Sequence, residues 1–279
     1  MATAMKIVDA RGQEVTFERP PRRIVCLVPS ITETLFALGV GDRVVGVTDF
    51  CVHPADGVAS RAKVGGTKNP KLNRVVELRP DLVIANREEN RRRDVERLEA
   101  SGLPVIVTYA RTVEEALRDV ERLGELLDAS AHAAEIVRDV SDGRVEVRAR
   151  VRSPPTSVVA LVWKRPYMAV GGDTFAHDLL TQSGGANPFF AHESRYPRIT
   201  EAELEEVAPE VLLLPTEPYA FGERDRQELL KLGCPAARDA RVHVVEGELL
   251  SWYGPRMGRA LRTFSELLYP GPGRKRTAP

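Results

Sequence analysis

The sequence predicts an α/β protein with two Rossmann-like lobes, a single long backbone helix that joins them, and a ligand cleft between the lobes. The first observation is an internal repeat, because residues 77–84 (ELRPDLVI) return as residues 206–213 (EVAPEVLL). Each copy ends a short amphipathic helix, turns at a proline that cannot continue the helix, and enters an apolar strand. A Gly-x-Pro follows each copy, at 102–104 and 233–235. A chain of 279 residues is also long enough for two modest domains.

The elements of the first lobe follow from periodicity and capping residues. Residues 7–17 are expected to form a hairpin, and residues 22–28 a buried strand of the kind found in parallel sheets. Ser30 and Glu33 have the spacing of a capping box, which predicts the start of a helix. The remaining apolar segments predict strands at 44–47, 82–85 and 105–109, and a helix over 90–101.

A long helical region should link the lobes. It begins at a second capping box, formed by Thr112 and Glu115, and reaches about Arg152 with a break at Asp128. A helix of ~24 residues is ~36 Å long, which is enough to cross from one lobe to the other.

The second lobe repeats the alternation. A strand is expected at 158–163, a helix over 173–182 with Asp173 as its N-cap, the repeated helix–strand unit, and a strand at 242–245. The expected domains are an N-terminal lobe (1–111), the linking helical region (112–155), a C-terminal lobe (156–270) and a disordered basic tail (271–279).

Composition excludes several classes of protein. Lysine plus arginine equals aspartate plus glutamate at 40 each, so we expect no nucleic-acid partner. The apolar runs are too short to cross a bilayer. Cys26, Cys51 and Cys234 are odd in number and far apart, which argues against a disulfide framework. Residues 1–17 show neither a signal peptide nor a lipidation cysteine, so we expect a cytoplasmic protein. We also expect a monomer. A trimmed sequence would instead allow a periplasmic or surface-anchored protein.

The N-terminal motifs resemble a known family. Residues 21–33 (PRRIVCLVPSITE) and 38–47 (LGVGDRVVGV) are similar to the opening of the helical-backbone metal receptors. These are the class III substrate-binding proteins of ABC transporters, which carry cobalamin, ferric siderophores and haem. Residues 78–84 and 184–187 (GGAN) fit the same pattern, so the resemblance spans residues 7–268. The segment 49–54 (DFCVHP) is similar to a cleft loop of the cobalamin-binding branch. The resemblance therefore implies a metal-chelate ligand, with cobalamin first and a ferric siderophore or haem next.

Two positions depart from the family pattern. Exported members dock on an ABC permease through one glutamate in each lobe, near the start of the repeated helix. Asn73 and Ala202 stand at these places, and Glu201 and Glu203 flank the second one. Glu203 also has the spacing of a capping-box partner for Thr200. These departures imply a non-exported member of the family, and they leave open whether a permease is served.

The loops that follow strands are the candidate ligand contacts, because open α/β sheets bind ligands beyond the carboxyl ends of their strands. In the first lobe the candidates are Ser30, Phe50, Cys51, His53, Lys68, Arg87 and Tyr109. In the second lobe they are Trp163, Arg165, Tyr167, Arg195, Glu217, Tyr219, Trp252 and Tyr253.

The residue types of this set suit a large conjugated or macrocyclic ligand. Both tryptophans and three of the six tyrosines lie in the expected loops of the second lobe, where flat aromatic walls offer contact area at low entropic cost. The arginines can grip carboxylate, phosphate or catecholate oxygens bidentately. The alternatives are that the aromatic residues cap the lobes from outside, that the arginines are solvated, and that Glu217 bonds only to local backbone.

Motifs for a resident metal or for catalysis are absent from the sequence. It contains no Cys-x-x-Cys, no His-Glu-x-x-His, no Gly-x-Ser-x-Gly elbow and no phosphate-binding glycine loop of known type. We therefore expect no built-in cofactor and no catalytic residue. The ligand itself could carry cobalt or iron, and one alternative places Cys51 or His53 near the open axial position of that metal. The alternative is a cytosolic carrier, sensor or enzyme that acts on a cobalamin- or siderophore-like compound.

Overall fold

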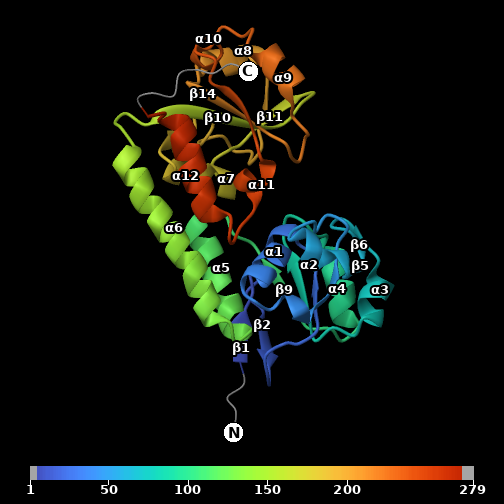
Figure 1. Cartoon of the computed structure of the whole chain (residues 1–279). Coiled ribbons are helices and arrows are strands. Elements are labelled where there is room, and N and C mark those ends of the chain that lie inside the picture. The colour runs from blue at the N-terminus through green and yellow to red at the C-terminus, as the bar shows by residue number, and fades with distance from the viewer. Residues whose placement is uncertain (1–4, 272–279) are drawn as a thin grey trace. The chain divides into compact units, whose positions relative to one another are not determined.

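Residues 5–271 are described by the computed structural model, and they divide into two units, each with its own sheet (Figure 1). Unit 1 contains the chain up to Ala110 together with Glu114–Val137 and Tyr253–Pro255. Unit 2 contains Arg111–Val113, Arg138–Trp252 and the residues from Arg256 onward. Apart from Gly271, the expected basic tail lies outside the described residues. No helix within 5–271 is long and apolar enough to cross a membrane.

Unit 1 is built on a parallel sheet of five strands in the order β5-β4-β3-β8-β9. Ile24 lies opposite Leu82 and Val25 opposite Val83, which places β3 beside β8 at the centre of the sheet. The strands are β3 (Ile24–Cys26), β4 (Val44–Val47), β5 (Ala62–Lys63), β8 (Leu82–Asn86) and β9 (Val105–Thr108). Their buried, β-branched composition is typical of a parallel sheet that is covered on both faces.

Helices α3 (Leu72–Glu77) and α4 (Arg92–Ala100) cover one face of this sheet, and their buried Val75, Val95 and Leu98 pack on the apolar side chains of the strands. The expected N-terminal hairpin is confirmed as β1 (Met5–Val8) paired with β2 (Glu14–Phe17). The other elements of this part of the chain are α1 (Pro29–Ala37), the 3-10 helix η1 (Gly41–Arg43), α2 (Ala55–Ala59), β6 (Gly65–Gly66), β7 (Asn69–Pro70) and α5 (Val113–Leu126).

Unit 2 contains a mixed sheet in the order β13-β11-β10-β14-β15, with β12 paired to β10. The pairs β10–β14 and β14–β15 are parallel, whereas β11 pairs antiparallel with β10 and with β13. The strands are β10 (Thr156–Trp163), β11 (Tyr167–Ala169), β12 (Gly185–Ala186), β13 (Arg198–Ile199), β14 (Val211–Pro215) and β15 (Val242–Val245). The expected α/β class is confirmed, although the antiparallel strands were not predicted.

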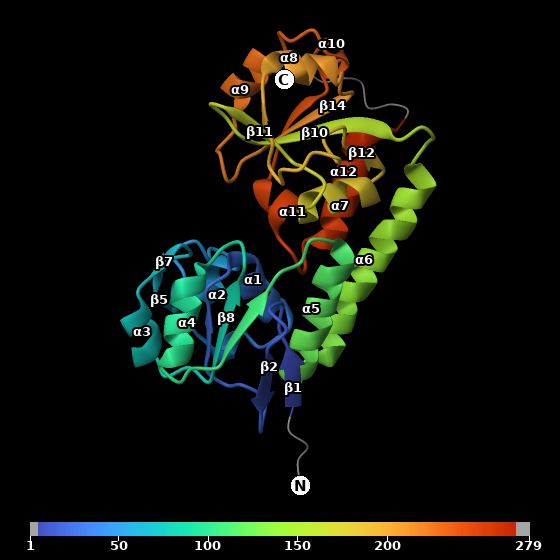
Figure 2. The same ribbon diagram turned by 180° about the vertical axis from the view of Figure 1, so that it is seen from behind.

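Helices lie on both faces of the sheet in unit 2. Figures 1 and 2 show one group on one face and a second group on the other. The first group is α8 (Glu201–Glu206), α9 (Glu223–Leu229) and α10 (Pro235–Arg238), and the second is α7 (Phe175–Gln182), α11 (Gly247–Ser251) and α12 (Met257–Leu268). The first group buries Leu204 and Leu229 against Leu212 and Leu214 of β14.

The sequence repeat forms the same turn in both units. Arg79 and Ala208 each have a positive φ, of 47° and 45°, one residue before the proline. After the proline, Asp81 accepts hydrogen bonds from the backbone N–H groups of Arg22 and Arg23, at 2.7–3.0 Å. In the second copy, Glu210 accepts one from the N–H of Ser157, at 2.8 Å. Each acid therefore anchors the chain near the start of the neighbouring strand, β3 or β10.

Two predicted helix caps are wrong, and one is confirmed. Helix α1 begins at Pro29 with Val28 as N-cap, so Ser30 lies inside the first turn and makes no cap. Helix α7 is capped by Thr174, whose hydroxyl accepts from the N–H of His177 at 3.1 Å, rather than by Asp173. The capping box of Thr200 and Glu203 is present in α8. The expected break at Asp128 is also present, with a φ of 55°, between α5 and α6 (Ser130–Arg150).

We predict that the acid of the first repeat stabilises the fold more than its counterpart. Asp81→Ala removes the acceptor of two backbone N–H groups and should lower the free energy of unfolding by about 1–2 kcal/mol, whereas Glu210→Ala removes the acceptor of one and should cost about 0.5–1 kcal/mol. Urea unfolding measures both values. Glu77→Ala, an exposed acid near the end of α3, is the matched control and should change little. Equal losses for Asp81→Ala and Glu77→Ala would contradict the anchoring role.

Candidate functional site

An aromatic cluster lies at the carboxyl end of strand β10 in unit 2. The ring of Trp163 meets the ring of Tyr219 edge-on, with centroids 5.8 Å apart and planes at 70°. Tyr219 in turn contacts Phe221, at 4.6 Å. Phe221 is buried in the core, whereas Trp163 is 43% exposed. The exposed indole of Trp163 therefore packs on Tyr219, which in turn packs on the buried Phe221.

A buried ion cluster holds the residue that follows this indole. The Nζ atom of Lys164 lies 2.5 Å from Oδ1 of Asp225 and 2.6 Å from Oε2 of Glu228. Only 7% of the Lys164 side chain is exposed. The second Asp225 oxygen accepts from the N–H of Gly222 at 3.0 Å, at the start of α9. The cluster thus ties the end of β10 to the segment that carries Tyr219 and Phe221.

The charges of this cluster stabilise one another. Burial alone would lower the pKa of Lys164, but the hydrogen bonds to the two carboxylates outweigh it and the pKa is raised. Burial would likewise raise the pKa of Asp225, yet the hydrogen bonds from Lys164 and Gly222 lower it. The hydrogen bond from Lys164 also lowers the pKa of Glu228. All three groups are therefore charged at neutral pH.

Glu217 and Trp252 form a second contact in unit 2. The indole N–H of Trp252 donates to Oε1 of Glu217 at 2.8 Å, and the hydroxyl of Ser251 donates to the same oxygen at 3.2 Å. Burial raises the pKa of Glu217, and the nearby Glu248 adds to the shift. The guanidinium of Arg256 lies over the indole, 5.2 Å from its centroid. Trp252 is only 7% exposed, so most of its surface is already covered by the protein.

The other candidates of the second lobe are spread over several environments. Arg165 is exposed in a left-handed conformation with a φ of 64°, two residues before β11. Tyr167 is half-buried in β11, and burial raises its pKa. Arg195 donates to the carbonyl oxygen of Asp173 at 2.5 Å, which fixes it on the loop before α7. Tyr253 is buried.

The candidates of unit 1 also differ in accessibility. Phe50 is 61% exposed, and the guanidinium of Arg87 lies 5.1 Å from the ring centroid of Tyr109. The ammonium of Lys68 donates to the carbonyl oxygen of Glu88, and His53 is half-buried. Phe50, Arg87 and Tyr109 thus combine an aromatic surface with a cation in the same unit.

Ser30 and Cys51 are both buried. The Sγ atom of Cys51 lies 3.2 Å from Oγ1 of Thr32 and 3.1 Å from Oγ1 of Thr48. Burial raises the pKa of this thiol, so it is protonated at neutral pH. Across residues 5–271, no group of three or more histidine, cysteine or acidic side chains is placed to hold a metal ion.

The sequence did not reveal the ion cluster that supports Trp163. The acidic partners of Lys164 lie 61 and 64 residues further along the chain, so no local pattern predicts this pairing. One local signal exists, since Asp225 stands three residues after Gly222 and so has the spacing of a capping acid.

The chain is similar to several known proteins. A family model described as periplasmic binding protein matches residues 24–231. An uncharacterized ABC transporter substrate-binding lipoprotein, YvrC of Bacillus subtilis, is 28% identical over 95% of this chain and 85% of its own. The vitamin B12-binding protein of Vibrio parahaemolyticus is 25% identical over 87% of each chain.

The solved structures that resemble this chain include a heme-binding and a vitamin B12-binding protein. A periplasmic heme-binding protein from Pseudomonas aeruginosa has a TM-score of 0.75 and 25% identity, over 90% of this chain and 94% of its own. The periplasmic vitamin B12-binding protein BtuF of Vibrio cholerae has a TM-score of 0.77 and 20% identity, over 89% and 97%. At this identity the second similarity concerns the fold alone.

The expectation of a cytoplasmic location is wrong. The matching family is described as periplasmic, and the Bacillus subtilis relative is named a lipoprotein. The same findings argue against the expected non-exported status.

We predict that the ion cluster contributes stability that depends on pH. Lys164→Met leaves two carboxylates without their cation, so the free energy of unfolding should fall by about 3 kcal/mol at pH 7. Because the folded-state pKa values of Asp225 and Glu228 lie below their ordinary values, this contribution is present above about pH 4. It is lost as the pH falls through the folded-state pKa values.

Urea unfolding of both proteins at neutral and acidic pH tests this prediction. Lys231→Met removes an exposed lysine beyond α9 and is the matched control, with an expected change within about 0.5 kcal/mol. A difference between wild type and Lys164→Met that stays constant as the pH falls would contradict the assignment.

Proposed function

The chain belongs to the periplasmic binding protein family, and we propose that it is a monomeric ABC-type substrate-binding protein for a metal-chelate macrocycle. Cobalamin is the first candidate ligand, and haem or a ferric siderophore comes next. The names of the relatives support this order, since the first relatives include vitamin B12-binding proteins and the solved structures include heme-binding proteins.

The observation that carries the proposal is the exposed indole of Trp163, which is braced by Tyr219 and Phe221. A corrin or porphyrin is a broad ring with apolar faces, and a rigid indole offers such a face contact area at low entropic cost. The buried Lys164 cluster fixes the backbone next to the indole. Ligand binding therefore costs little conformational entropy at this loop.

Charged groups near the aromatic residues would give such a ligand its orientation. Arg165 follows Trp163 by two residues, and Arg87 stacks on Tyr109 in unit 1. Guanidinium groups bind carboxylates and phosphates bidentately. Haem carries carboxylates and cobalamin carries a phosphate, so both classes suit these cations. The cobalt or iron would enter and leave with the ligand, without a resident metal of the protein.

We also propose an ABC permease as partner, with weakened docking. Asn73 and Ala202 occupy the two places where the resemblance implies docking glutamates, and both side chains are exposed. Glu203 does not replace the second glutamate, because its carboxylate accepts from the N–H and hydroxyl of Thr200, at 2.7 and 2.8 Å.

We predict that Trp163 governs ligand affinity. Trp163→Ala should weaken binding of cobalamin or haem by about 2 kcal/mol, or about 30-fold, because an indole at a desolvated contact is lost. Titration calorimetry measures the affinity, and circular dichroism checks the fold. Phe190→Ala is the control, since Phe190 is 63% exposed in unit 2 but lies outside the predicted ligand loops. Equal affinities of wild type and Trp163→Ala for every ligand that binds would refute the aromatic site.

We predict that restoring the two carboxylates strengthens docking. A charged contact broken from one side costs about 2–5 kcal/mol. Asn73→Glu combined with Ala202→Glu should therefore stimulate the ATPase of a reconstituted vitamin B12 permease far more than the unmodified protein does. Asn73→Gln with Ala202→Gln controls for side-chain size. Full stimulation by the unmodified protein would show that docking does not need these carboxylates.

A further inference from the structure

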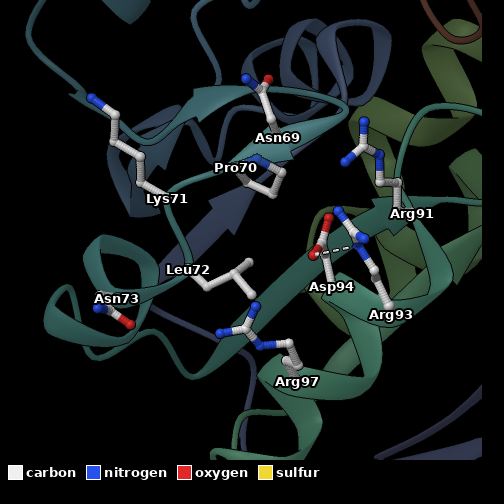
Figure 3. Close-up of a pocket in the computed structure, with 9 residues that line it drawn as sticks. All are labelled: Asn69, Pro70, Lys71, Leu72, Asn73, Arg91, Arg93, Asp94 and Arg97. Carbon is white, nitrogen blue, oxygen red and sulfur yellow. Dashed lines mark ion pairs between the residues drawn. The ribbon is translucent and has the colours of Figure 1, made fainter.

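A pocket of about 380 Å³ lies between helices α3 and α4 of unit 1. Figure 3 shows Asn69, Lys71 and Asn73 on one side of it and three arginines of the α4 region on the other. Pro70 and Leu72 supply apolar surface between the two sides. All lining residues belong to unit 1, and none belongs to the set of ligand contacts that was predicted from the sequence.

The charge of this pocket is strongly positive. Lys71, Arg91, Arg93 and Arg97 line it, and Asp94 is the one acid among its lining residues. Asp94 is 7% exposed and contacts Arg93 at 3.7 Å, which is the ion pair drawn in Figure 3. Within residues 5–271, no carboxylate forms an ion pair with the remaining three cations.

This crowding is unusual for a chain whose charges balance overall at 40 of each sign. On the same helix, Arg92 pairs with Glu96 at 2.7 Å and is not among the residues that line the pocket. Like charges that share one pocket repel each other, and a bound anion would relieve that repulsion.

We propose that this pocket binds a small organic anion that carries at least two phosphate or carboxylate groups. The volume falls within the range of small-molecule sites, about 300–1,000 Å³. Arginine forks bind carboxylate and phosphate bidentately, and three of them line one pocket here. The side-chain amides of Asn69 and Asn73 add neutral donors, and Leu72 and Pro70 suit a short carbon skeleton.

A small ligand explains the arrangement better than an acidic protein segment does. Arg91 and Arg97, which have no carboxylate partner among the described residues, line one pocket, and the neighbouring Arg92 already has its own carboxylate. A docking segment would instead make use of cations spread along the helix. The site is also independent of the proposed macrocycle site, since the two share no residue.

Titration calorimetry with pyrophosphate and with citrate tests the proposal at physiological salt. The wild-type protein should bind at least one of these probes saturably, with one site per chain. Arg91→Gln and Arg97→Gln should each weaken that binding about tenfold or more, because each removes a charge-assisted hydrogen bond. Arg92→Gln, on the same helix but outside the pocket, is the matched control and should leave the affinity unchanged. The two probes separate phosphate from carboxylate as the preferred group.

Two kinds of result would overturn the proposal: small-anion binding that is absent or not specific to the pocket, and binding of an acidic peptide instead. One is the absence of saturable binding for both probes at millimolar concentration, or binding that Arg92→Gln weakens as much as Arg91→Gln. The other is binding of a hexaglutamate peptide with neither small anion bound, which would assign the pocket to an acidic protein segment. Titration of Arg91→Gln with cobalamin distinguishes the two sites. This variant should bind cobalamin with the affinity of the wild-type protein.

Discussion

Both sheets depend on one constraint, the reversal of a helix into a buried strand within a few residues. Arg79 and Ala208 take the left-handed conformation, which is costly for residues other than glycine, and the next residue is a proline that cannot extend the helix. Asp81 or Glu210 then binds backbone N–H groups next to the neighbouring strand. The reversal and the strand pairing are thus fixed together, so β8 and β14 start in register with β3 and β10.

The position of the candidate site follows from that pairing. Because β10 and β14 are parallel, their carboxyl ends lie at the same edge of the sheet, and the residues that follow them meet there. Trp163 ends β10, while Tyr219 lies in the loop after β14. Such loops would be mobile without a further bond. The buried Lys164 cluster supplies it by joining the end of β10 to α9.

Patterns within a few residues predicted the fold well, whereas contacts between distant residues escaped prediction. The repeat, the hairpin and the Thr200 capping box depend on local chemistry, and all are present. Ser30 is not the N-cap because proline favours the first helical position, so the helix begins earlier in the chain, at Pro29. Trp252 was predicted to lie in a ligand-binding loop, but its indole N–H donates to Glu217, 35 residues away in the sequence. Helix α12 could have been predicted from the apolar spacing of Met257, Leu261, Phe264 and Leu268.

The repeated helix and strand have the same backbone turn in both units, but the exposed charges of the two helices, α3 and α8, differ. Helix α8 has four glutamates and no basic residue among its six residues, whereas α3 follows Lys71, contains one arginine and one glutamate, and borders the cationic pocket. A partner surface that complements α8 would meet repulsion at α3, and like charges that face each other across an interface cost several kcal/mol. The two repeated helices therefore offer different charge to anything that meets them. The duplicated turn preserves the fold at both places, and it leaves the exposed positions of each helix free to serve a different contact.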